Sequence, residues 1–149
     1  GTRPMKGFAL PMIICNMALE VENIIPDKSL LDTTIDECLS EILNVFYQPD
    51  LGVMLENVAP DGTPVDCFEG RVINPGHDLE ALWFMMNLGL RRKDKELIEK
   101  CVKISLDVIE YGWDSMAAFS TSSTGRDTLS SSLSGIRSFG GYILSLQSV

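Results

Sequence analysis

One segment of the 149-residue chain, Phe68–Phe84, concentrates the residue types that could do acid–base chemistry. It contains His77, the single histidine of the sequence. Histidine is the side chain best suited to take up and return a proton near neutral pH. His77, Glu80 and Trp83 follow one another at steps of three, so on a helix an imidazole, a carboxylate and an indole share one face. Such a face could bind and deprotonate a sugar.

The residues before His77 predict the start of the helix that would carry it. Asn74 is a favourable N-cap, and Pro75 suits the first helical position, where its missing N–H costs nothing. Gly76 allows another group to approach the backbone closely. The predicted helix runs from Pro75 to about Arg91, with its positive end on the side of His77. The alternative is structural: the histidine satisfies a neighbouring group and Trp83 packs in the core.

Composition limits the partners of the chain. The net charge is -9 and the sequence pI is about 4.5, which argues against binding to nucleic acid or to anionic membrane surfaces. The sequence contains no apolar run long enough to span a membrane. The apolar stretch Phe8–Cys15 is too short and lacks a cleavage pattern, so we expect no signal peptide.

The four cysteines predict free thiols rather than a metal site or disulfides. No pair has C-x-x-C spacing, and a single histidine makes a zinc site improbable. Each cysteine lies among apolar residues, which favours buried thiols in a reducing compartment and therefore a cytoplasmic protein. The four are Cys15, Cys38, Cys67 and Cys101.

Apolar periodicity predicts four helices that form two pairs. The first pair is Pro11–Glu22 and Ser29–Tyr47, and the second is Pro75–Arg91 and Asp94–Tyr111. In each pair a nearly all-apolar helix precedes one with a polar face, which indicates an inner helix buried on all sides and an outer helix facing water. Between the pairs, MLENV and TPVDCF flank the turn sequence APDG and predict a short β-hairpin within residues 50–66.

Two architectures fit this order of helices. A repeated helix pair that cannot close a core alone indicates part of an all-α toroid built from concentric layers. The alternative is a plain four-helix bundle, which the long connection before Pro75 disfavours. We therefore predict a domain over residues 1–114. Residues 115–149 contain eleven serines and three threonines and read as a disordered, Ser-rich tail.

Residues 3–114 resemble the N-acylglucosamine 2-epimerase family, which includes cellobiose 2-epimerases and related aldose–ketose isomerases. The resemblance is carried by PMIICNMALEV, by MLENVAPDGTPVDCFEGRVINPGHDLEALWF and by the closing YGWD. It implies an (α/α)6 barrel and a reaction that inverts the sugar carbon next to the carbonyl. In the family two histidines act as acid and base on opposite faces of an enediolate intermediate.

The resemblance also implies roles for particular residues. His77 falls on one catalytic histidine, while Glu80 and Trp83 fall on positions that line the sugar cavity. Asn16 matches a polar position on the preceding inner helix, and Arg71 and Asn74 lie in the motif as substrate-binding or structural residues. No cofactor is implied. The expected partner is a small-molecule sugar, such as N-acetylglucosamine or N-acetylmannosamine, and a homodimer is one candidate assembly of the full-length protein.

The chain departs from the family pattern at both ends. Family members are far longer and carry an early substrate-binding arginine and a second catalytic histidine that have no match here. Reading residues 115–149 from the third base of each codon can give a family-like string with a Trp pair, so we interpret the tail as out of frame; the alternative is a genuine Ser-rich tail. We expect this polypeptide alone to be inactive.

Two other function classes stay open. A glycoside hydrolase on an α/α barrel would need two carboxylates flanking the scissile bond. Asp78 and Glu80 are available, but residues two apart on a helix point in different directions. The third hypothesis is a non-catalytic fragment that only binds partners.

Overall fold

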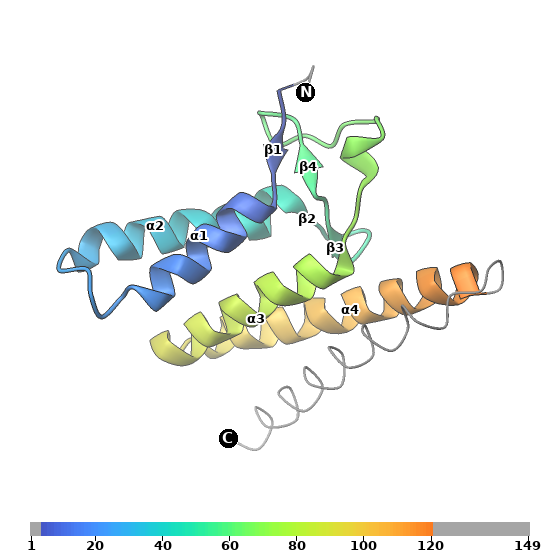
Figure 1. Ribbon diagram of the computed structural model, residues 1–149. Helices are drawn as coiled ribbons and strands as arrows, with labels where there is room; N and C mark the ends of the chain where they lie inside the picture. Colours follow the sequence, from blue (N-terminus) through green and yellow to red (C-terminus); the bar gives the residue numbers. More distant parts are fainter. Residues whose placement is uncertain (1–3, 121–149) are drawn as a thin grey trace. The chain divides into compact units, whose positions relative to one another are not determined.

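The computed structural model describes residues 4–120, and the chain divides into two units, residues 1–111 and 112–149. The first unit is mostly helical with two small sheets (Figure 1). Its helices are α1 (Ala9–Glu20), α2 (Lys28–Glu41), α3 (Pro75–Arg92) and α4 (Lys95–Ser120), the last of which continues past the boundary at Tyr111. A π-helical turn, Ile42–Phe46, extends α2, and a 3-10 turn, Glu69–Arg71, precedes α3.

The four predicted helices are present at close to their predicted bounds. Local capping explains where three of them begin: Asp27 accepts from the Leu30 N–H at 3.1 Å, Asn74 caps α3, and Asp94 accepts from the Leu97 N–H at 3.0 Å. One end is wrong, because α4 ends at Ser120 rather than at Tyr111. Met116, Ala117 and Ala118 favour helix, so the serine content after Asp114 does not stop it there.

The predicted hairpin is wrong in its residues. A hairpin does lie between the helix pairs, but it joins β2 (Tyr47–Gln48) to β3 (Val53–Met54) through a turn in which Gly52 has φ +68°. The predicted strand in MLENV contributes β4 (Asn57–Val58), which pairs with β1 (Lys6–Gly7) near the start of the chain. The APDG turn forms, with the Gly62 N–H donating to the Ala59 carbonyl at 2.8 Å. Pro64 has no N–H to donate to a partner strand, and no strand is formed after this turn before α3.

The extended segment Val53–Val58 connects the parts of the chain that flank the helices. It pairs in turn with β2, with Ile73 through an isolated bridge, and with β1. The rings of Phe8 and Phe46 meet beside it with centroids 5.5 Å apart. The largest fully buried side chains come from this segment, from the ends of α1 and α2 and from the inner sides of α3 and α4: Phe8, Phe46, Ile42, Met54, Leu82, Met85, Met86, Leu88, Ile104, Val53, Val58 and Val108.

The helices pack in the predicted pairs. In Figure 1, α1 lies along α2, in agreement with their contacts, and α3 is drawn along α4, which it approaches closely at Gly89. Arg91 near the end of α3 donates to the Leu19 carbonyl at 2.7 Å and to Glu22 at 2.8 Å, which fastens α3 to the end of α1. Arg92 makes ion pairs with Asp32 and Asp36 of α2. Gly89 lets α4 approach α3 closely, since a Cβ there would meet Ile98 at 2.6 Å.

One prediction about the inner helices needs correction. We expected α1 to be buried on all sides, but Leu10, Ile13 and Met17 are 66 %, 49 % and 59 % exposed. The described residues cover only the opposite side of α1, where Met12, Cys15 and Leu19 are buried. A closed barrel is therefore not formed by residues 4–120. The predicted boundary at residue 114 stays a prediction, and residues 121–149 of the predicted tail lie outside the described residues.

Candidate active site

The start of α3 is built as the sequence predicts. Asn74 is extended, and its side-chain oxygen accepts from the N–H groups of Gly76 and His77 at 3.2 and 3.4 Å. Pro75 occupies the first helical position. These contacts satisfy backbone donors that a helix start leaves open. They also place His77 in the first turn of α3, at the positive end of the helix dipole.

His77 is paired with a carboxylate that sequence reasoning did not single out. Its Nδ1 lies 2.6 Å from Oε1 of Glu56. The imidazole is 39 % exposed and the Glu56 side chain only 14 %. A carboxylate accepts but does not donate, so this contact favours the tautomer with the proton on Nδ1 and leaves Nε2 available as a base. The pair has the geometry of a general base held in orientation by a third group.

Glu56 is itself firmly held. Its N–H donates to the Val72 carbonyl at 3.0 Å, and its own carbonyl accepts from the Phe8 N–H at 2.9 Å. Glu56 is 21 residues from His77 in the chain, so no local spacing could link them. The signal that was available is the MLENV string, which contains Glu56 within the family resemblance but does not reveal its partner.

Asp78, next to His77, is fully buried. Its Oδ2 accepts from the Met54 N–H at 3.0 Å, whereas its buried Oδ1 has no hydrogen-bond partner within the described part of the chain. Burial raises the pKa of Asp78 to about 7, against the lowering effect of the Met54 hydrogen bond, and the nearby charge of Glu56 raises it further. Sequence reasoning considered Asp78 only as half of a hydrolase pair, which its burial and its bond to β3 disfavour.

Glu80 and Trp83 lie on the same face of α3 as His77, as their spacing predicts. This face is exposed among the described residues, although α3 was predicted to be an inner helix buried on all sides. Glu80 is exposed and Trp83 is 43 % exposed, with its ring 5.5 Å from that of Phe84. The structural alternative of Trp83 as a core residue therefore does not hold within the described residues. The imidazole, the carboxylate and the indole face solvent from one helix.

The remaining candidates are more loosely connected to His77. Asn74 contacts it directly through the cap. Arg71 is exposed on the 3-10 turn and forms an ion pair with Asp66. Asn16 is half-buried on α1, a helix that packs against α3.

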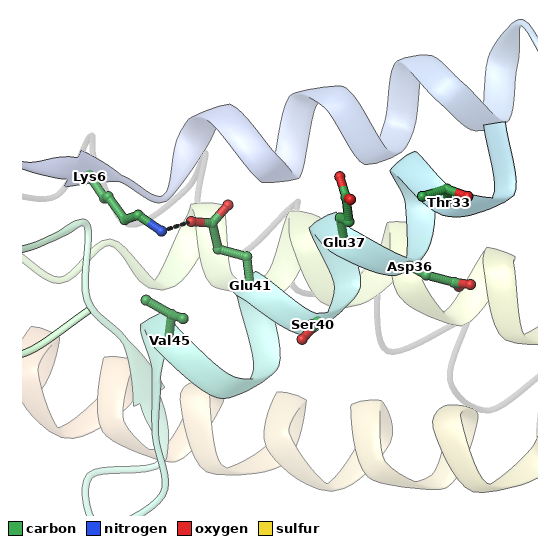
Figure 2. Close-up of a pocket in the computed structure, with 7 residues that line it drawn as sticks. All are labelled: Lys6, Thr33, Asp36, Glu37, Ser40, Glu41 and Val45. Atoms are coloured by element: carbon green, nitrogen blue, oxygen red, sulfur yellow. Dashed lines mark hydrogen bonds and ion pairs between the residues drawn. The ribbon is translucent and has the colours of Figure 1, made fainter. Parts of the chain in front are cut away.

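A separate surface hollow of about 550 Å³ lies away from His77, between α2 and the start of the chain (Figure 2). Its polar lining includes the Lys6–Glu41 ion pair, at 2.6 Å, with the acidic residues Asp36 and Glu37 beside it. It shares no residue with the face around His77. This hollow is open and acidic, and it does not extend the candidate active site.

Within residues 4–120 no group of three or more His, Cys, Asp or Glu side chains is arranged to hold a metal ion. All four cysteines are free, and burial raises the pKa of Cys15 to about 11 and that of Cys101 to about 12, which makes them poor nucleophiles. In the same part of the chain no helix combines the length and apolar character needed to cross a membrane.

Comparison with solved structures shows which known fold the described residues resemble. The described fold is similar to part of a solved sugar epimerase from a ruminal bacterium, with a TM-score of 0.59 and 16 % sequence identity over 71 % of this chain and 26 % of that chain. This likeness concerns the fold alone.

The sequence places the chain in a family. The model of the N-acylglucosamine 2-epimerase (GlcNAc 2-epimerase) family matches residues 3–130, and the chain belongs to that family. It is 35 % identical over 118 residues to N-acylglucosamine 2-epimerase of Rattus norvegicus and 32 % identical over 118 residues to that of Homo sapiens. The aligned region is 76 % of this chain but only 27 % of each relative, so the chain spans about a quarter of their length.

Proposed function

We propose that this chain is part of a sugar 2-epimerase that interconverts N-acetylglucosamine and N-acetylmannosamine, or a related aldose, by moving a proton at the carbon next to the carbonyl. The observation that carries the proposal is the His77–Glu56 pair, which leaves Nε2 of the imidazole free on a solvent-facing side of α3. Family membership supports the class of reaction.

The geometry suits proton abstraction next to a carbonyl. In the proposed reaction Nε2 of His77 takes the proton from the sugar carbon, and the electron pair moves onto the carbonyl oxygen to give an enediolate. The imidazolium that forms is stabilised by Glu56, as in other histidine–carboxylate pairs. The developing oxyanion requires fixed donors. The N–H groups of Gly76 and His77 are bonded to Asn74, so the start of α3 contributes the positive end of its dipole rather than free donors. Protonation on the opposite face would complete the inversion.

The other sequence candidates are assigned as substrate-binding residues. Glu80 and Trp83 share the exposed side of α3 with His77 and offer a hydrogen-bonding carboxylate and an apolar platform for a sugar ring. Asn16 is proposed to reach the sugar from α1, and Asn74 to act through the cap. Arg71 is the weakest assignment, because it is already paired with Asp66 on the surface.

The 149-residue chain alone is proposed to be inactive. A two-base inversion needs an acid or base on each face of the sugar, and the sequence contains one histidine. The exposed apolar side of α1 is consistent with a helical barrel completed by further helices, as in the proposed (α/α)6 architecture. The hydrolase alternative is disfavoured, because Asp78 is buried against Met54 while Glu80 is exposed.

The test is a chimera in which residues 3–114 replace the matching segment of the rat relative. The chimera and the chain alone are each incubated with N-acetylmannosamine in deuterated water. We expect the chimera to introduce deuterium next to the carbonyl and to form the second epimer, and the chain alone to do neither. A correctly folded chimera that introduces no deuterium next to the carbonyl and forms no second epimer would refute the proposal.

A further inference from the structure

We propose that Asp78 is a positioning residue for His77: its buried carboxyl holds the strand segment that carries Glu56, so that Glu56 keeps the imidazole in a single tautomer. The proposal rests on the proposed function only for the chemical meaning of that tautomer. The juxtaposition of His77 with Glu56 and of Asp78 with Met54 is independent of any substrate.

Two contacts run side by side between the same two elements. His77 and Asp78 are neighbours in the first turns of α3, while Met54 and Glu56 are two residues apart on the extended segment. The His77 imidazole reaches Glu56 at 2.6 Å, and the Asp78 carboxyl reaches the Met54 N–H at 3.0 Å. A shift of α3 along the segment would therefore break both contacts together.

The two contacts differ in their exposure to water. The His77 imidazole is 39 % exposed, whereas Asp78 and Met54 are fully buried. A hydrogen bond in a low-dielectric interior is stronger and more sharply oriented than one that water can replace. Asp78 is thus suited to hold α3 in register with the extended segment. The water-accessible contact between His77 and Glu56 depends on this alignment.

The backbone hydrogen bonds of Glu56 do not by themselves align α3 with the extended segment. The bonds from Glu56 to Val72 and to Phe8 hold its backbone against the segments before α3 and before α1. The chain then turns at Asn74 and Pro75 into α3. Asp78 is the residue beyond this turn that joins the helix itself to β3.

The unpartnered oxygen supports a role beyond stability. A buried polar atom without a hydrogen bond is destabilising and calls for an explanation. Oδ1 of Asp78 is such an atom, while Oδ2 makes the one bond that aligns the helix with the strand. A carboxyl that leaves one buried oxygen unpaired fits a position where the alignment made by the other oxygen is needed.

The single histidine makes a direct test simple. Long-range 1H–15N NMR of the 15N-labelled 149-residue chain reads the tautomer of His77 without assignment, at a pH high enough for the imidazole to be neutral. Glu56→Gln serves as the reference for a lost carboxylate. Asp78→Ala removes the acceptor and leaves a cavity, Asp78→Val removes it while filling the space, and Asp78→Asn keeps an oxygen acceptor.

We expect the parent chain to have the proton on Nδ1 with well-separated ring-nitrogen shifts. Asp78→Ala or Asp78→Val should move those shifts toward the averaged values of a free imidazole, and Asp78→Asn should restore the parent pattern. An unchanged tautomer in a folded Asp78→Val chain would overturn the proposal. Failure of both apolar variants to fold, while Asp78→Asn folds, would assign Asp78 to stability alone and also overturn it. None of these outcomes depends on turnover, so they are separate from the deuterium test of function.

Discussion

Asp78 should make the stability of the helical unit depend on pH, and Asp78→Asn should remove that dependence. Burial raises the pKa of Asp78 from 3.8 to about 7. The folded chain therefore keeps this proton up to about pH 7, whereas the unfolded chain releases it near pH 3.8. Between these two values the folded state binds more protons, so the free energy of unfolding falls as the pH rises.

The size of the effect follows from the pKa difference. The rise in the pKa of Asp78 from 3.8 to about 7 lowers the free energy of unfolding at high pH by about 4 kcal/mol, at roughly 1.4 kcal/mol per pKa unit. The stabilising contribution is complete below the unfolded pKa and is lost as the pH passes the folded pKa. Between pH 5 and pH 8 the free energy of unfolding should fall by about 3 kcal/mol from this group alone.

Asp78→Asn is the matched change because it stays neutral and keeps an oxygen that can accept from Met54. Its amide nitrogen would replace Oδ1, which has no hydrogen-bond partner among residues 4–120. Urea unfolding between about pH 5 and pH 8, followed by the fluorescence of Trp83 and Trp113 at low protein concentration, measures the difference. We expect the variant to gain about 3 kcal/mol relative to the parent as the pH rises through this window.

Asp50→Asn provides the control, since Asp50 is exposed and its change removes the same charge from the surface. Its unfolding curves should follow those of the parent at every pH. A free-energy difference between Asp78→Asn and the parent that stays constant from pH 5 to pH 8 would show that Asp78 is ionised throughout in the folded chain. That result would refute the reasoning.

Three further predictions concern packing and association. Gly89→Ala should destabilise the unit by about 1–3 kcal/mol in urea titrations, because its Cβ would meet Ile98 at 2.6 Å. Gly7→Ala is the control, since its Cβ would meet its nearest neighbour at 4.0 Å and should destabilise the unit far less. Equal effects of the two changes would contradict the close approach of α3 and α4. Arg91→Ala should cost about 1 kcal/mol through its bonds to Leu19 and Glu22, and an unchanged urea midpoint would show that this contact contributes nothing. Met17→Lys, on the exposed apolar side of α1, should reduce concentration-dependent self-association in sedimentation experiments. Asp50→Lys, an exposed position outside α1, is the control, and identical sedimentation of Met17→Lys and the parent would exclude this face as the contact.

Sequence reasoning succeeded where the determinants are local. Asn74 and Pro75 fix the start of α3 by capping and by a preset backbone angle, and the apolar period fixes the buried sides of the helices. The spacing of His77, Glu80 and Trp83 likewise places them on one face of one helix.

The errors arise where a residue's partner is distant in sequence. The MLENV strand pairs with Lys6 and Gly7 rather than with the residues just after it, so the nearest turn signal was misleading. Glu56 meets His77 across 21 residues, and only the fold reveals that contact. The exposed side of α1 was predicted to be buried because an all-apolar helix does not say which elements cover it.

The central claim is that His77 is one base of a two-base epimerase. Its most direct test is His77→Gln in the rat chimera, with deuterium exchange followed separately from each epimer. Since each base would serve one face of the sugar, we predict that the variant loses interconversion and loses exchange from one epimer while retaining exchange from the other. Equal exchange from both epimers, whether undiminished or lost together, would contradict the account.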